Sequence, residues 1–215
     1  MKNAFFNIHT HNKFKNADEI NIINLDIENF DRSQACSIGI PPWQVSQDNA
    51  VSLEKLRKIS KEENVVAIGE IGLDKRLEIS DDVQLKLLTE QIGIAKETEK
   101  PIIFHCVNKY SELIALKKKL KIPNKCIIHG FRGNARLAQQ LIHENFYLSF
   151  GEKIIYHPET VLATPLNRIF TETDTSSCGI KEVYDIVGRI KQIEIKELKE
   201  YIEKNIHECF PTLVF

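Results

Sequence analysis

The sequence predicts an α/β protein that folds as a TIM (β/α)8 barrel, in a minimal and distorted form. Three observations support this prediction: the strand-like segments are continuous apolar runs, helical patterns separate the later runs, and the chain has 215 residues. Continuous apolar runs are typical of parallel strands that are covered on both faces. Strands that alternate with helices form a parallel sheet, and about eight of them form a barrel from about 200 residues upward.

Short runs rich in β-branched and aromatic residues predict the strands. The runs expected to form strands are residues 5–11, 20–25, 35–40, 65–71, 101–106, 126–130, 146–150 and 168–173. The connections that follow the first two runs are too short for a normal crossover helix. We therefore expect short loops or single helical turns in the first quarter of the chain.

Apolar residues at three- and four-residue spacing predict the helices. The stretches with this spacing are residues 51–63, 85–95, 111–120, 137–141 and about 195–209. Ser80 and Asn134 are expected to cap the second and fourth of these helices, because their side-chain oxygens can accept hydrogen bonds from first-turn amides. The fourth is expected to end near Asn145, since asparagine is common at the left-handed end of a helix.

Composition places the chain among globular proteins, with 42% apolar and 27% charged residues. We expect one domain over residues 1–215. No apolar run is long enough to cross a bilayer, and the N-terminus offers no signal-peptide core, so we expect a cytoplasmic protein with no membrane contact. Nothing in the sequence indicates an obligate protein partner. A net charge of −1 argues against binding of nucleic acid by bulk electrostatics, but it allows an enzyme with local positive charge.

Five cysteines are scattered along the chain without a Cys-x-x-Cys pair, so neither a zinc ribbon nor a disulfide framework is indicated. Histidines are more informative. His9 and His11 alternate with Asn7 on one face of the first strand, and two such imidazoles can hold one metal ion. Taken alone, a His-x-His pattern is a weak signal, because a short strand that runs into a polar turn produces it by chance.

Further strand-like runs also end in side chains that bind metals. These side chains are Glu70, His105, His129 and Asp174. The carboxyl ends of barrel strands lie at one rim, so all six side chains are expected to meet there. Four imidazoles and two carboxylates suit two divalent ions that share a carboxylate and a water. One or two ions are therefore expected, with zinc, manganese, nickel or iron favoured over magnesium.

Six short motifs occur in one order along the chain. They are Asn-Ile-His-Thr-His at 7–11, Gly-Glu-Ile-Gly-Leu-Asp at 69–74, Ile-Ile-Phe-His-Cys at 102–106, Ile-Ile-His-Gly-Phe-Arg-Gly at 127–133, Tyr-Leu-Ser-Phe-Gly at 147–151 and Thr-Glu-Thr-Asp at 171–174. With these motifs the sequence resembles the TatD-type metal-dependent hydrolases of the amidohydrolase superfamily. The resemblance implies a TIM-barrel hydrolase with a divalent metal centre, and many members of the family are described as deoxyribonucleases.

The resemblance also implies a role for each ligand. His9 and His11 would hold one metal, His105 and His129 would hold the second, and Glu70 would bridge the two. A water held between two cations loses a proton near neutral pH and can attack phosphorus in line.

Asp174 would ligate the first metal and act as general base, so Asp174 and Glu70 are the expected catalytic residues. Glu172 lies two residues earlier on the same strand face and is expected to orient an imidazole.

Three further residues are expected to contact substrate. Arg132 and Lys75 lie just past strand ends and are expected to hold a substrate phosphate, although either is equally consistent with a solvated loop cation. Trp43 offers a surface on which a base can stack, or it packs at an exposed edge.

The chain departs from the family pattern in three places. Asn7 stands where the family has an aspartate, which predicts that the metal is held less tightly or in a site of different charge. Pro41 stands in a segment where the family often has a histidine. The loop at 175–179 is very short, so we expect an open substrate groove.

The resulting prediction is a divalent-metal-dependent hydrolase that cleaves phosphodiester bonds of DNA. One alternative is a hydrolase of a small amide, lactone or phosphoester at the same centre. The other is a degenerate barrel that binds metal without turnover. The expected partner is therefore DNA or a small phosphoester substrate.

Overall fold

The computed structural model describes residues 4–13, 16–46 and 49–213. Its strands are β1 (Phe5–Thr10), β2 (Glu19–Leu25), β3 (Cys36–Ile38), β4 (Val65–Asp74), β5 (Ile102–Val107), β6 (Cys126–Ile128), β7 (Phe146–Phe150) and β8 (Ile169–Thr171). Its α-helices are α1 (Ala50–Ile59), α2 (Asp81–Thr98), α3 (Tyr110–Leu120), α4 (Ala135–His143), α5 (Pro158–Ala163), α6 (Ile180–Lys191) and α7 (Ile195–Cys209). Short 3-10 helices are η1 (Ile27–Asn29), η2 (Pro42–Gln44), η3 (Glu152–Tyr156) and η4 (Leu166–Arg168).

The strands follow one another in the sheet in their sequence order, from β1 to β8. β1 pairs in parallel with β2, β3 with β4, β4 with β5, and β7 with β8. A parallel bridge between Thr10 and Asp174 joins the segment after β8 to the end of β1. This cyclic strand order is the one that a (β/α)8 barrel requires.

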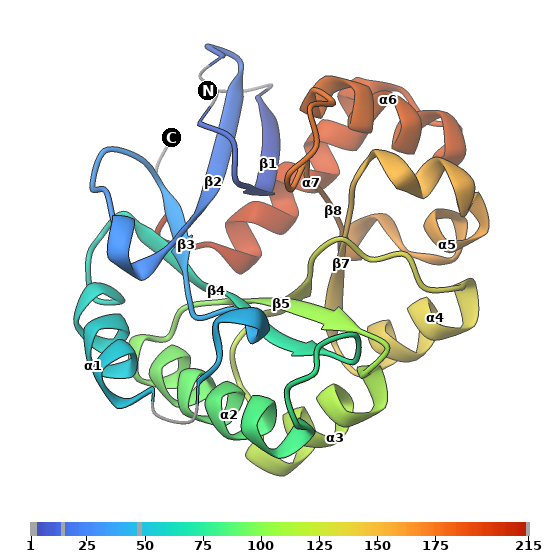
Figure 1. Ribbon diagram of the computed structural model, residues 1–215. Coiled ribbons are helices and arrows are strands. Elements are labelled where there is room, and N and C mark those ends of the chain that lie inside the picture. The colour runs from blue at the N-terminus through green and yellow to red at the C-terminus, as the bar shows by residue number, and fades with distance from the viewer. Residues whose placement is uncertain (1–3, 14–15, 47–48, 214–215) are drawn as a thin grey trace. The chain divides into compact units, whose positions relative to one another are not determined.

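The chain contains two compact units, residues 24–127 and residues 1–23 with 128–215. In the first, β4 is buried along its whole length, and α2 packs against it (Figure 1). Leu88, Ile92 and Ala95 supply the buried stripe of α2. The prediction of one domain over residues 1–215 stays a prediction.

In the second unit, α6 and α7 pack on β1 and β8 (Figure 1). Asn205 of α7 donates hydrogen bonds from Nδ2 to the carbonyl oxygens of Leu166 and Ile169, both at 2.9 Å. Phe210, just past the helix, meets the ring of Phe170 edge-on with centroids 5.8 Å apart. These contacts fix the start of β8, and with it the segment that carries the acidic residues after that strand.

The predicted strands are confirmed, with small differences at their ends. β4 continues to Asp74, whereas β6 stops at Ile128 and β8 at Thr171. Gly130 and Asp174 have positive φ angles of 55° and 52°, which is incompatible with a continuing strand. As expected for the first quarter, η1 is a single helical turn between β2 and β3.

The predicted helices are confirmed, except that α1 ends at Ile59 and not at residue 63, and one predicted cap is wrong. The Asn134 side chain accepts a hydrogen bond from the Leu137 amide, as predicted. Ser80 precedes α2 as expected, but its side chain makes no capping hydrogen bond. Asp81 and Asp82 lie in the first turn instead, where their negative charges stabilise the positive end of the helix dipole. α5 and α6 lie in stretches where no helix was predicted. No helix in the described part of the chain is long and apolar enough to cross a membrane.

Candidate metal centre

The end of β1 carries two imidazoles. His9 is fully buried, and His11 lies one residue past the strand with about a third of its side chain exposed. Their rings are nearly perpendicular, with centroids 5.3 Å apart. Asn7 is buried on the same strand, and its amide is directed toward Thr173, as shown by hydrogen bonds in both directions. The strand therefore places both ring systems at its carboxyl end.

Asp174 faces both histidines. Its Oδ1 lies 3.7 Å from His9 Nε2 and 3.5 Å from His11 Nε2. The backbone holds this arrangement, because the Asp174 amide donates to the His9 carbonyl and the His11 amide donates to the Asp174 carbonyl, both at 3.0 Å. These two bonds stabilise the left-handed backbone of Asp174, a conformation that aspartate tolerates better than most residues.

The three side chains fit a divalent ion. Their ligand atoms all lie within 4.8 Å of one another. Ligands about 2.1 Å from a tetrahedral zinc ion lie roughly 3.4 Å apart, close to the separations found here. Imidazole and carboxylate are also the usual ligands of such ions. The group formed by His9, His11 and Asp174 is therefore a possible metal site.

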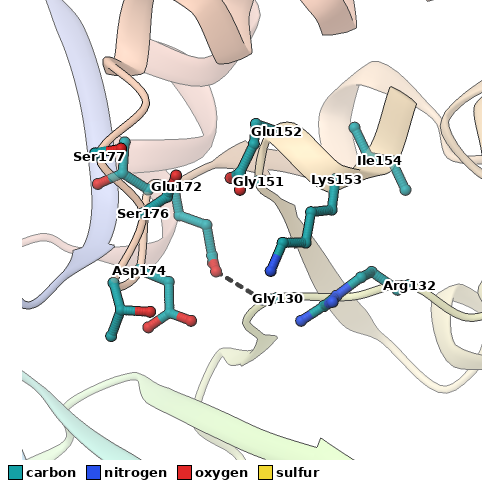
Figure 2. A pocket seen from close by; sticks show the side chains of 12 residues that line it. Gly130, Arg132, Gly151, Glu152, Lys153, Ile154, Glu172, Asp174, Ser176 and Ser177 are labelled. Atoms are coloured by element: carbon teal, nitrogen blue, oxygen red, sulfur yellow. Dashed lines mark hydrogen bonds between the residues drawn. The ribbon is translucent and has the colours of Figure 1, made fainter. Parts of the chain in front are cut away.

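His129 and Glu172 lie beside this group. The His129 ring is 4.1 Å from that of His9, centroid to centroid, and is buried. Its Nδ1 lies 3.3 Å from Glu172 Oε1. The same carboxylate oxygen accepts a hydrogen bond from the Gly130 amide at 2.8 Å (Figure 2). Glu172 is thus positioned to fix the orientation of the His129 imidazole.

Glu70 and His105 come together in residues 24–127. His105 Nδ1 lies 2.7 Å from Glu70 Oε1, and His105 Nε2 lies 3.0 Å from Asp74 Oδ2. The Glu70 amide donates to Asn24 Oδ1 at 2.7 Å. Both ring nitrogens of His105 therefore face carboxylates, so an ion bound by either nitrogen would be shared with the facing acid.

Asp74 had no predicted role, although it closes one of the six motifs. Burial opposes its ionisation, but hydrogen bonds from Arg76 and His105 outweigh that effect and lower its pKa to about 2. Asp74 is therefore a carboxylate at neutral pH and holds His105 in place. β4 extends three residues beyond its predicted end, so Asp74 lies at the carboxyl end of the strand. The rule that functional residues follow strand ends could therefore have identified it.

The predicted substrate residues lie in different surroundings. Arg132 lines a cavity of about 290 Å³ beside Asp174. Trp43 is 45% exposed, and its ring meets that of His105 edge-on with centroids 5.1 Å apart. Lys75 is exposed just past β4, where its amide donates to the Val107 carbonyl.

The cavity next to Asp174 also contains a cation that was not predicted. Figure 2 shows Lys153 of η3 and Arg132 directed into it from the segments after β7 and β6, with Glu172 and Asp174 opposite. Lys153 lies three residues past the end of β7. Strand 7 was expected to end at residue 150, so the rule that functional residues follow strand ends could have identified it.

The fold and this site define a TIM-barrel metal-dependent hydrolase. The family model for TatD related DNase matches residues 6–211, so the chain belongs to this family, which confirms the resemblance in its motifs. It is 29% identical to the uncharacterized metal-dependent hydrolase YabD of Bacillus subtilis over 86% of this chain and 80% of YabD. It is 30% identical to the uncharacterized metal-dependent hydrolase YjjV of Escherichia coli over 64% of this chain and 56% of YjjV.

Solved structures confirm the fold. The crystal structure of YjjV, a TatD homologue from Escherichia coli, superimposes with a TM-score of 0.84 at 22% identity, over 98% of this chain and 99% of that chain. A TatD family hydrolase from Entamoeba histolytica gives a TM-score of 0.78 at 20% identity, over 99% of this chain and 100% of that chain. The predicted TIM-barrel fold is therefore correct.

Proposed function

We propose that this hydrolase cleaves phosphodiester bonds of DNA with the help of one or two divalent ions. The observation that carries the proposal is the His9, His11 and Asp174 group beside a cavity with two cationic side chains. Metal-dependent hydrolysis of phosphodiesters needs both ligands for an ion and positive charge around the phosphate. The family description agrees with this reaction class.

Asp174 is the proposed general base. About 38% of its side chain is exposed, so water can reach the carboxylate, whereas His9 is inaccessible. His9 and His11 would hold the ion with Asp174, and Glu172 would keep His129 oriented through the contact at Nδ1. A bound divalent ion supplies Lewis-acid charge and lowers the pKa of water in its vicinity.

The roles of the remaining predicted residues are also part of the proposal. Glu70 and His105 would complete the metal centre, as the resemblance implies. Lys75 would contact a substrate phosphate, and Trp43 would offer its exposed ring to a base. The expected physiological partner is DNA.

A second proposal is hydrolysis of a small phosphoester, amide or lactone at the same centre. The size of the cavity favours it, because about 290 Å³ is at the small end of ligand sites. The net charge of −1 also gives DNA no overall electrostatic attraction. Non-catalytic metal binding is the third reading, motivated by Asn7 and Pro41 at positions where the family usually has other residues.

The deciding experiment is nucleotide release from DNA by the purified protein with added Mn²⁺ or Mg²⁺. We expect metal-dependent release that falls about 100-fold or more in Asp174→Asn, because general-base catalysis contributes that much. Asp185→Asn, a half-exposed acid on α6 whose carboxylate pairs with Arg189, serves as the matched control and should retain activity. Absence of release from DNA, with metal bound, would disprove the nuclease proposal.

Competition separates the two substrate classes. If DNA is the substrate, unlabelled DNA should inhibit cleavage, and the inhibition should weaken as salt rises, because phosphate contacts release counterions. Hydrolysis of small esters without any inhibition by DNA would favour the second proposal.

A further inference from the structure

Arg132 and Lys153 are the cations of the cavity beside Asp174. Both side chains are exposed and directed into it (Figure 2). Neither forms an ion pair or a side-chain hydrogen bond with any residue in the described part of the chain. Other cations of this protein do have such partners, as Arg76 does with Asp74.

Among the described residues, none of the three acids of the same cavity forms an ion pair with these two cations. Asp174 faces His9 and His11, and Glu172 is held by His129 and the Gly130 amide. Glu152 also lines the cavity, but it forms no ion pair with either cation in the structure of the described residues. The positive charge of Arg132 and Lys153 is therefore available to an anion that enters from solvent.

We infer that Arg132 and Lys153 form an anion subsite that holds a phosphate monoester at the end of the substrate. The inference rests on the proposed phosphodiester hydrolysis. Two cations match a monoester, which carries a charge of about −1.5 to −2 at neutral pH, better than an internal diester with a single charge. The planar guanidinium of Arg132 can bind two phosphate oxygens at once, and the Lys153 ammonium adds a point charge.

The position of the subsite gives it a consequence for specificity. Because it adjoins Asp174, a terminal phosphate held there places the adjoining ester bond near the general base. The small volume of the cavity admits a chain end more readily than the middle of a duplex. The enzyme should therefore act from phosphorylated ends, or on small molecules that carry a phosphate monoester.

The experiment compares oligonucleotides that differ only in a terminal phosphate or hydroxyl, placed in turn at the 3′ and 5′ ends. For the preferred phosphorylated end, Arg132→Gln and Lys153→Gln should each raise KM about tenfold or more, the usual loss for a charge-assisted hydrogen bond. The rise in KM should be several-fold smaller for the hydroxyl-ended substrate, and kcat for the phosphorylated one should change less than its KM. Lys153→Arg keeps the charge and should restore most of the affinity.

Two matched variants control for loss of general surface charge. Arg136→Gln on α4 and Lys196→Gln on α7 each remove an exposed cation outside the cavity. They should leave kcat and KM unchanged for both substrates. Thermal unfolding of every variant checks that it folds. The subsite does not exist if the wild type has the same KM for phosphorylated and hydroxyl-ended oligonucleotides. It is also excluded if Arg136→Gln raises the KM for the phosphorylated end as much as Arg132→Gln does.

Binding of inorganic phosphate, measured by calorimetry, separates this inference from the proposed function. Wild-type binding that is lost in Arg132→Gln and Lys153→Gln supports the subsite even if no DNA is cleaved, in which case the nuclease proposal alone fails. Cleavage of DNA with equal phosphate affinity in wild type and both variants overturns the subsite and leaves the nuclease proposal intact.

Discussion

The side chain of Asn7 joins β1 to the segment after β8. Its Nδ2 donates to Thr173 Oγ1 at 2.9 Å, and its Oδ1 accepts from the Thr173 amide at 3.1 Å. Thr173 Oγ1 in turn donates to Thr10 Oγ1 at 3.0 Å. An ionised aspartate can accept hydrogen bonds but cannot donate one, so the amide is suited to this pairing. Asn7 therefore positions the backbone directly before Asp174, whereas its predicted effect on metal affinity stays a prediction.

A double-mutant cycle tests the role of this pair. Asn7→Ala removes two hydrogen bonds to Thr173 and leaves its buried amide with only the longer bond to the His9 carbonyl, at 3.3 Å. The free energy of unfolding should therefore fall by about 1–3 kcal/mol. Thr173→Ala should lower the free energy of unfolding by a similar amount. The two effects should be non-additive by about 1 kcal/mol, as measured by urea denaturation. Additive effects would show that the two side chains do not depend on each other.

At the scale of the elements, Lys100 links the start of β5 to the end of α1. The side chain is buried, and its Nζ donates to the carbonyl oxygens of Ser60 and Glu62. These carbonyls follow the last helical turn, where backbone acceptors lack helical partners. Burial lowers the pKa of the Lys100 ammonium.

This pKa shift predicts how Lys100 affects stability with pH. The folded protein releases the Lys100 proton at a lower pH than the unfolded chain, whose lysine pKa is about 10.4. Between the two values the unfolded chain binds more protons, so the stability that Lys100 contributes rises with pH.

The test compares the free energy of unfolding of the wild type with that of Lys100→Met. The variant should be less stable at pH 7 by about 1–3 kcal/mol, because two carbonyls lose a donor. The difference in free energy of unfolding should then grow from pH 8 to pH 10, as other lysines affect both proteins equally. A difference that shrinks over this range would contradict the burial of the ammonium.

At the scale of the whole molecule, acids and bases nearly balance, so local groups of charge decide what an anion meets. The net charge is −1, yet Arg132 and Lys153 share one cavity beside a group of metal-binding side chains. Such an arrangement attracts a phosphate to one place without making the protein a general binder of nucleic acid. Metal binding at the same place should also stabilise the fold, because the unfolded chain lacks a preformed site.

Metal addition therefore predicts a rise in thermal stability. With Mn²⁺ or Zn²⁺ at about 100 times its Kd, the gain should be about 3 kcal/mol, and a chelator should reverse it. His11→Ala should remove most of this gain, because it removes one of the proposed ligands. His11 is partly exposed, so its loss should leave the core intact. His143→Ala on α4 is the control and should respond to metal as the wild type does. An equal shift in His11→Ala would exclude this residue as a ligand.

The order of strands and helices was predictable from the sequence, because each depends on neighbouring residues. Continuous apolar runs identified the strands, and helical spacing identified α1, α2, α3, α4 and α7. The pattern of α6 was also present, with Ile180, Val183 and Val187 buried, although no helix was predicted there. The ends of strands were less certain, since the positive φ angles of Gly130 and Asp174 depend on contacts made outside the strand.

The chemical character of the centre was equally a property of the sequence, since histidines and acids that follow strands are visible in the order of residues. Contacts between distant residues were not. Asn7 and Thr173 are separated by 166 positions, and no local periodicity indicates that they bond. The convergence of Arg132 with Lys153 and the pairing of His105 with Asp74 likewise needed the tertiary structure. These contacts depend on how strand ends are brought together by packing, and packing is a property of the folded chain as a whole.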